Sequence, residues 1–196
     1  MMELVLASTS PARRTLLTQA GLTFKVVAPP VDEEALKETM IGAPSPEVAL
    51  RLAVAKAKAV ARQAPDAMVI GADQVLNCEG RVFEKPLTSQ RAQQQLEQLR
   101  GREHCLETAI CCARGADILW HHVGRARLVM RYFSDEFLKD HLEKLRSEDL
   151  TSVGGYRLEG AGIQLFEAIE GDYFTILGLP LLPLLAFLRS QEAIAS

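Results

Sequence analysis

The chain lacks several features that would place it in a familiar class of protein. Its four cysteines have no CxxC spacing, so they do not form the disulfide framework of a secreted domain. A net charge of −3 gives no overall basic field for nucleic acid, so any phosphate must be held by locally placed cations. No P-loop, GxSxG or HExxH spacing occurs, and there is no internal repeat.

The chain also has no apolar run long enough to cross a membrane. The stretch from Leu177 to Leu188 is about twelve residues long and contains Pro180 and Pro183. Near the N-terminus, Glu3 and a short apolar run do not form a signal peptide. We therefore expect no membrane association and a cytoplasmic location.

The composition indicates a folded domain, with 48% hydrophobic and 24% charged residues. Strand-like and helix-like patterns alternate, which predicts an α/β chain with a mixed sheet flanked by helices. Strands are predicted over Glu3–Ala7, Thr23–Val27, Met68–Ala72, Cys105–Ala113, Ile118–Val129 and Gly162–Leu165. Helices are predicted over Ala12–Ala20, Pro46–Ala64, Ser89–Leu99, Ser134–Leu145 and Pro180–Arg189, with capping sequences at Ser45, Thr88 and Ser134. The long strands on either side of Arg114-Gly115-Ala116-Asp117 are expected to form an antiparallel hairpin.

The most distinctive segment is the run Ser8-Thr9-Ser10-Pro11-Ala12-Arg13-Arg14, which follows the first apolar strand. Hydroxyls and a proline at a helix start leave backbone N–H groups free to attract phosphate. An arginine can add two parallel bonds to phosphoryl oxygens. The same residues also fit an ordinary capped turn with solvated arginines, and this segment alone leaves both interpretations open.

Further charged residues interrupt apolar surroundings. Asp73 follows a buried strand, at the end where α/β sheets bind ligands. Glu33 follows a proline-rich extended loop, Lys56 lies in an alanine-rich helix, and Lys85 precedes a proline. Carboxylates can bind Mg²⁺ and activate water, while cations neutralise phosphates, so the set suits metal-assisted phosphoanhydride hydrolysis. Taken singly, each residue also fits a structural role at the surface or in a turn.

A cluster of possible zinc ligands occurs on the predicted hairpin. Neighbouring residues on a strand face opposite sides, so core thiols and surface imidazoles are favoured over a zinc site. The residues concerned are His104, Cys105, Cys111, Cys112, His121 and His122.

Motifs along nearly the whole chain resemble those of the Maf proteins, also called septum-formation-inhibitor-like proteins. The matching blocks are Leu6 to Arg13, Val31-Asp32-Glu33, Leu52-Ala53 with Lys56-Ala57, Gly71-Ala72-Asp73-Gln74-Val75, Glu84-Lys85-Pro86-Leu87, Thr108-Ala109, Gly155 to Gly160, Gly171-Asp172-Tyr173 and Gly178-Leu179-Pro180-Leu181. The resemblance implies that residues 1–196 form one domain of two lobes around an elongated mixed sheet, with a nucleotide-binding cleft. It also implies hydrolysis of nucleoside triphosphates to a monophosphate and pyrophosphate with a divalent metal, Mg²⁺ or Mn²⁺.

The resemblance assigns roles to individual positions. Asp73 corresponds to the general base, and Glu33 and Asp73 correspond to metal ligands, although one carboxylate need not serve fully in both roles. The remaining phosphate-handling positions are Ser8, Ser10, Arg13, Lys56 and Lys85.

Three further positions correspond to sites that select the substrate: Ala12, Gln74 and Glu159. The branch of dTTP/UTP pyrophosphatases would have Arg, Thr and Gln there, so Gln74 and Glu159 resemble the second branch, associated with 7-methyl-GTP. A carboxylate suits the N1–H and amino edge of guanine. That branch can have a Trp at position 12, able to stack on a cationic purine. Ala12 lacks this ring, so the preferred base stays open.

Two other functions fit the same residues. The family name reflects a cell-division phenotype, so a nucleotide-binding regulator of septum formation that acts through partner contacts is the alternative. A general phosphatase releasing orthophosphate is a second rival. The apolar hairpin and C-terminal segment are compatible with a homodimer, although core packing explains them equally well.

Overall fold

The computed structural model describes residues 2–195. Their strands form a seven-stranded mixed sheet with the order β2-β1-β3-β5-β6-β7, and β4 pairs with β3. The chain divides into two compact units, the first of residues 1–74, 108–124 and 172–196 and the second of residues 75–107 and 125–171. The expected mixed α/β architecture flanked by helices is confirmed.

The first unit contains the parallel strands β1 (Leu4–Ala7), β2 (Lys25–Val26) and the start of β3 (Met68–Cys78). It also contains the end of β5 (Glu103–Arg114) and the start of β6 (Asp117–Met130), which are neighbours joined by a two-residue turn and are therefore antiparallel. Its helices are α1 (Pro11–Gln19), α2 (Glu33–Glu38), α3 (Ser45–Ala61), α7 (Tyr173–Ile176) and α8 (Leu181–Ser190).

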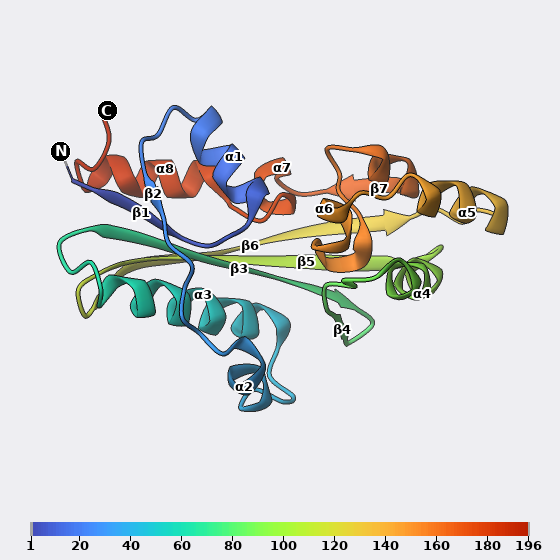
Figure 1. Ribbon diagram of the computed structural model, residues 1–196, viewed down its shortest axis with the longest axis horizontal. Helices are drawn as coiled ribbons and strands as arrows, with labels where there is room; N and C mark the ends of the chain where they lie inside the picture. Colours follow the sequence, from blue (N-terminus) through green and yellow to red (C-terminus); the bar gives the residue numbers. More distant parts are fainter. Residues whose placement is uncertain (1, 196) are drawn as a thin grey trace. The chain divides into compact units, whose positions relative to one another are not determined.

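Helices cover both faces of the strands in this unit (Figure 1). On one face, leucines of α1 and α8 pack against alternate residues of β1, β3 and β5 in one buried cluster. Alternation along a strand turns the intervening residues to the other face, where α3 lies. There Gly71 allows close approach, because a Cβ on it would come within 2.4 Å of the Ala53 carbonyl oxygen.

The second unit contains the other halves of β3, β5 and β6 together with β4 (Arg81–Phe83) and β7 (Phe166–Glu170). Its helices are α4 (Ser89–Leu99), α5 (Asp135–Glu143), α6 (Ser147–Leu150) and the 3₁₀ turns η1 (Val153–Gly155) and η2 (Ala161–Leu165). A buried contact joins β5 to the segment after η1, since His104 Nε2 lies 2.7 Å from the Tyr156 hydroxyl.

Most predicted elements are present, and several differences have clear causes. The predicted strand Gly162–Leu165 is wrong, because those residues form the 3₁₀ turn η2 and the strand β7 starts at Phe166. Gly162 lies against the backbone of Arg157 in this turn, and a Cβ there would come within 2.5 Å of the Arg157 carbonyl oxygen, so the turn requires a glycine. Ser45 does not cap α3, whose N-cap residue is Pro44 and makes no side-chain bond. Thr88 and Ser134 cap their helices as predicted.

Candidate active site

The N-terminal motif forms a capped turn between β1 and α1. The Ser10 hydroxyl accepts from the backbone N–H of Arg13 at 3.4 Å, and the Ser8 hydroxyl accepts from the N–H of Ser10 at 3.2 Å. Pro11 occupies the first helical position, where no N–H is needed. The hydroxyls of Ser8 and Ser10 therefore form a capped turn, as the structural interpretation expected, but its expectation of a solvated Arg13 is wrong, because Arg13 is buried.

Arg13 points inward and is buried, whereas Arg14 is exposed. Its Nε donates to the Gly178 carbonyl at 2.8 Å, and Nη1 donates to the Ala72 carbonyl at 2.8 Å and to Ser8 Oγ at 3.1 Å. These bonds engage Nε and Nη1 of the guanidinium. Burial lowers the pKa of Arg13, and the charges of Asp73 and Glu33 oppose that shift.

Lys56 joins two carboxylates from different parts of the first unit. Its Nζ lies 2.5 Å from Asp73 Oδ1 and 2.9 Å from Glu33 Oε1. The side chains of Lys56 and Asp73 are 7% and 11% exposed, while that of Glu33 is 43% exposed. Lys56 reaches Asp73 because α3 packs directly on Gly71, which faces the same side of β3 as Asp73.

The sequence predicted that Asp73 follows the end of its strand, and this prediction is wrong, because Asp73 lies inside β3. The apolar run stops at Ala72, but β3 continues to Cys78, because its C-terminal part pairs with β4. The neighbouring strand β1 pairs only as far as Gly71. Asp73 therefore lies just beyond the end of β1, where that strand turns into α1, and this position brings it near Arg13.

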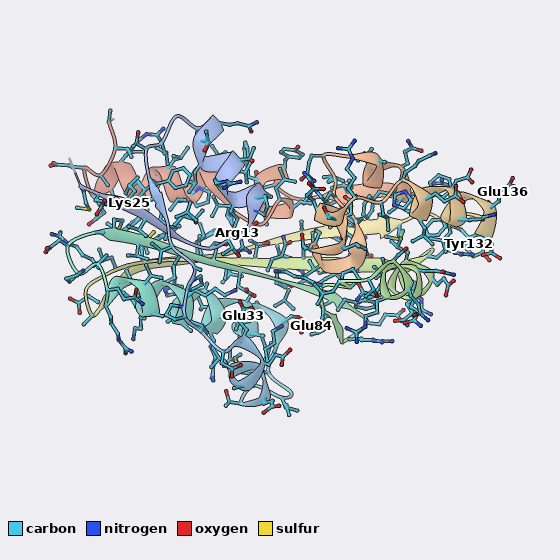
Figure 2. The ribbon with its side chains drawn as sticks, viewed as in Figure 1. Arg13, Lys25, Glu33, Glu84, Tyr132 and Glu136 are labelled. Carbon is cyan, nitrogen blue, oxygen red and sulfur yellow. The ribbon has the colours of Figure 1, made fainter. Side chains whose placement is uncertain are left out.

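Glu33 lies at the start of a helix that was not predicted. Asp32 caps α2 by accepting from the N–H of Ala35 at 3.0 Å, which makes Glu33 the first helical residue. In Figure 2, Arg13 lies on the α1 side of the strands of the first unit and Glu33 lies on the α2 side. The structure thus brings together Arg13, Lys56, Asp73 and Glu33 around the end of β1.

The positions expected to select the substrate have different settings. Ala12 is partly buried in the first turn of α1. Gln74 faces away from Asp73, and its amide nitrogen donates to Thr108 Oγ1 and to the carbonyls of Thr175 and Ile176 at 2.8 to 3.0 Å. The amide nitrogen of Gln74 is thus fully engaged within the first unit.

Two predicted site residues belong to the second unit. Lys85 is exposed in the segment between β4 and α4. The Glu159 carboxylate is held by Arg157, whose Nε and Nη2 both lie 2.8 Å from Glu159 Oε1. That arrangement leaves Oε2 of Glu159 as the carboxylate oxygen outside this pair.

The carboxylates fit a hard divalent cation. Among residues 2–195 no group of three His, Cys, Asp or Glu side chains could enclose a metal. Mg²⁺ does not need such a cage, since it is commonly bound by one or two carboxylates, waters and substrate phosphates. Lys56 places a positive charge between Asp73 and Glu33.

Sequence reasoning gave no role to several residues that position this site. Thr108 is fully buried, and its hydroxyl donates to the Thr175 carbonyl at 2.9 Å. Gly178 has a φ of 92°, and its carbonyl fixes Arg13. For Thr108, the available signal was a hydroxyl residue inside the apolar strand Cys105–Ala113. For Gly178 there was no signal, because a bond to a main-chain carbonyl does not depend on the type of side chain.

The fold and the cluster define an α/β protein with paired cations and carboxylates gathered at the start of a helix, suited to a polyphosphate. The chain belongs to the Maf family, since the model for Maf-like protein matches residues 3–191. Within residues 2–195, no helix is both long and apolar enough to span a membrane.

Similar proteins cover almost the full length of the chain. A protein of Rhizobium meliloti named 7-methyl-GTP pyrophosphatase is 52% identical over 97% of both chains. A protein of Granulibacter bethesdensis named nucleoside triphosphate pyrophosphatase is 50% identical, over 98% of this chain and 99% of that protein. One of Rhodospirillum rubrum with the latter name is 44% identical over 98% of this chain.

Proposed function

We propose that the chain is a nucleoside triphosphate pyrophosphatase, which hydrolyses its substrate to a nucleoside monophosphate and pyrophosphate. The observation that carries this proposal is the cluster in which Lys56 joins Asp73 and Glu33 beside the buried Arg13. The similar proteins with pyrophosphatase names support the same activity.

In this reaction, water attacks the α-phosphorus and the bond to the bridging oxygen of the β-phosphate breaks. Asp73 takes the proton of the attacking water. Because Lys56 engages Oδ1 of Asp73, Oδ2 is the oxygen available for that proton. Arg13 and Lys56 stabilise the negative charge that develops on the departing pyrophosphate.

A divalent cation, Mg²⁺ or Mn²⁺, would be held by Glu33 and Asp73. When bound, it neutralises phosphate charge and polarises the phosphorus centre. Ser8, Ser10 and the N–H groups at the start of α1 are suited to bind phosphoryl oxygens. The family resemblance also places Lys85 among the phosphate-binding residues.

The nucleobase of the substrate is less narrowly defined by these residues than its triphosphate. Glu159 Oε2 is an acceptor for the N1–H and amino group of guanine, and similar proteins named 7-methyl-GTP pyrophosphatase support that nucleotide as a substrate. Ala12 provides no ring for stacking, so we propose a broader range of purine triphosphates. We also propose a cytoplasmic enzyme that does not bind nucleic acid and forms a homodimer.

The test is product identification with the purified chain. Canonical nucleoside triphosphates and 7-methyl-GTP are each incubated with Mg²⁺, and pyrophosphate and orthophosphate are measured separately. The proposal expects one pyrophosphate per monophosphate formed. Orthophosphate as the primary product would establish a general phosphatase instead. Binding of a triphosphate without any cleavage would favour the alternative role of a nucleotide-binding regulator of cell division.

A further inference from the structure

Thr175 in α7 is the centre of a buried hydrogen-bonded cluster in the first unit. Its carbonyl accepts from Gln74 Nε2 at 3.0 Å and from Thr108 Oγ1 at 2.9 Å. Thr108 Oγ1 in turn accepts from Gln74 Nε2 at 2.8 Å. The Thr108 hydroxyl therefore acts as donor and acceptor at once, and the three residues close a ring of hydrogen bonds.

Two more residues meet Thr175 from other directions. Its N–H and hydroxyl donate to Asp172 Oδ2 at 2.7 and 2.8 Å. Gly124 in β6 approaches so closely that a Cβ there would lie 2.9 Å from Thr175 Oγ1. We call these five residues, Gln74, Thr108, Gly124, Asp172 and Thr175, the Thr175 cluster. Its members other than Thr175 are the residues at which the chain leaves or enters the first unit.

The Thr175 cluster is connected to the catalytic groups at two points. The Thr175 carbonyl also accepts from the N–H of Gly178 at 3.0 Å, and the Gly178 carbonyl accepts from Arg13 Nε at 2.8 Å. Asp73 precedes Gln74, so fixing the Gln74 side chain on one face of β3 fixes the strand that presents Asp73 on the other. One cluster thus holds the arginine and the carboxylate in place.

We propose that Thr108 is a positioning residue for pyrophosphate release. Its hydroxyl orients the last turn of α7, so that the Gly178 carbonyl aims the Arg13 guanidinium at the triphosphate. This inference rests on the proposed function, and it assigns Thr108 no contact with the substrate. A shift of about 1 Å in a catalytic group can reduce a rate by up to about a hundredfold, so an indirect contact of this kind has a measurable effect.

The test compares two substitutions at one position. Thr108→Val keeps the shape and the β-branch but removes the hydroxyl, whereas Thr108→Ser keeps the hydroxyl and removes the methyl. We expect Thr108→Val to lower kcat per folded molecule about tenfold with KM within about twofold, because the lost interaction acts on the transition state. Thr108→Ser should retain most of kcat. The control is Thr151→Val in the second unit, which removes an exposed hydroxyl bond to the Glu148 carbonyl.

A readout independent of activity completes the test. Hydrogen–deuterium exchange of residues 172–179 should accelerate in Thr108→Val and stay near the wild-type rate in Thr108→Ser. A wild-type kcat in Thr108→Val, or an equal loss in both variants, would overturn the positioning role. If the wild-type chain releases no pyrophosphate, the proposed function fails and this inference fails with it, even if faster exchange in Thr108→Val still shows that Thr108 holds α7.

Discussion

The substitution Asp73→Asn separates catalysis from folding, because the local structure limits its effect on stability. Asparagine keeps the shape of the side chain and an oxygen that can accept from Lys56. Lys56 also keeps its partner Glu33 at 2.9 Å. Exchanging a bond between two charged groups for one from the ammonium to a neutral amide costs about 1 to 2 kcal/mol, which is small beside a typical stability of about 5 to 15 kcal/mol. The variant should therefore fold.

Its activity should fall much further than its stability. Loss of a general base typically lowers a rate by about 10² to 10⁴, equivalent to about 3 to 5 kcal/mol in the barrier. The change Lys56→Met should also lower activity, because Lys56 is a proposed phosphate-binding cation, but it should cost more stability than Asp73→Asn does. It leaves the buried Asp73 carboxylate without its nearest cation, and we expect it to destabilise the fold by about 3 kcal/mol.

The assay combines urea unfolding with the rate of pyrophosphate release at saturating substrate. Asp117→Asn, an exposed carboxylate at the start of β6, is the matched control and should change stability by less than about 0.5 kcal/mol. A kcat within tenfold of wild type in Asp73→Asn would remove Asp73 from the proton transfer. Greater destabilisation by Asp73→Asn than by Lys56→Met would refute the view that Lys56 stabilises the buried Asp73 carboxylate.

Two further predictions concern Glu33, the proposed metal ligand, and the buried His104. Glu33→Gln should raise the Mg²⁺ concentration for half-maximal activity about tenfold, while the exposed neighbour Glu34→Gln should not, and an equal response would exclude Glu33 as a ligand. Burial lowers the pKa of His104 to about 4, so below about pH 6.5 the unfolded chain gains a proton that the native state does not, and stability should fall by about 2 kcal/mol by pH 5. Urea titrations at pH 7.5 and pH 5 should show a smaller fall for His104→Gln.

Local patterns predicted the regular elements well but not their ends. Helical spacing and side-chain caps locate α1, α4 and α5, because these are properties of neighbouring residues. The continuation of β3 past Ala72 depends on pairing with β4, a contact between segments that the local pattern does not describe. The short helix α2 was missed because it buries no residue and so has no apolar stripe.

In the candidate site, too, the sequence indicated the residues but not the contacts between distant segments. The types of residue at Arg13, Lys56, Asp73 and Glu33 suggested phosphate and metal chemistry, and the family resemblance singled out these positions. Their arrangement was not predictable from spacing. Lys56 lies seventeen residues before Asp73 and reaches it only because α3 packs on a glycine. Arg13 owes its orientation to two main-chain carbonyls, a contact that any residue type can provide.

The two units are built from segments that alternate along the chain, and this affects how the protein folds. The first unit combines three segments of the chain that are far apart in the sequence. Within it, β1 pairs with β3, and Leu4 lies opposite Met68. Pairing between strands so far apart in the sequence slows folding, because a long loop of chain must close before the two strands can meet. A single proteolytic cut cannot release either unit intact, and during synthesis the first cannot be completed until its last helix has emerged from the ribosome.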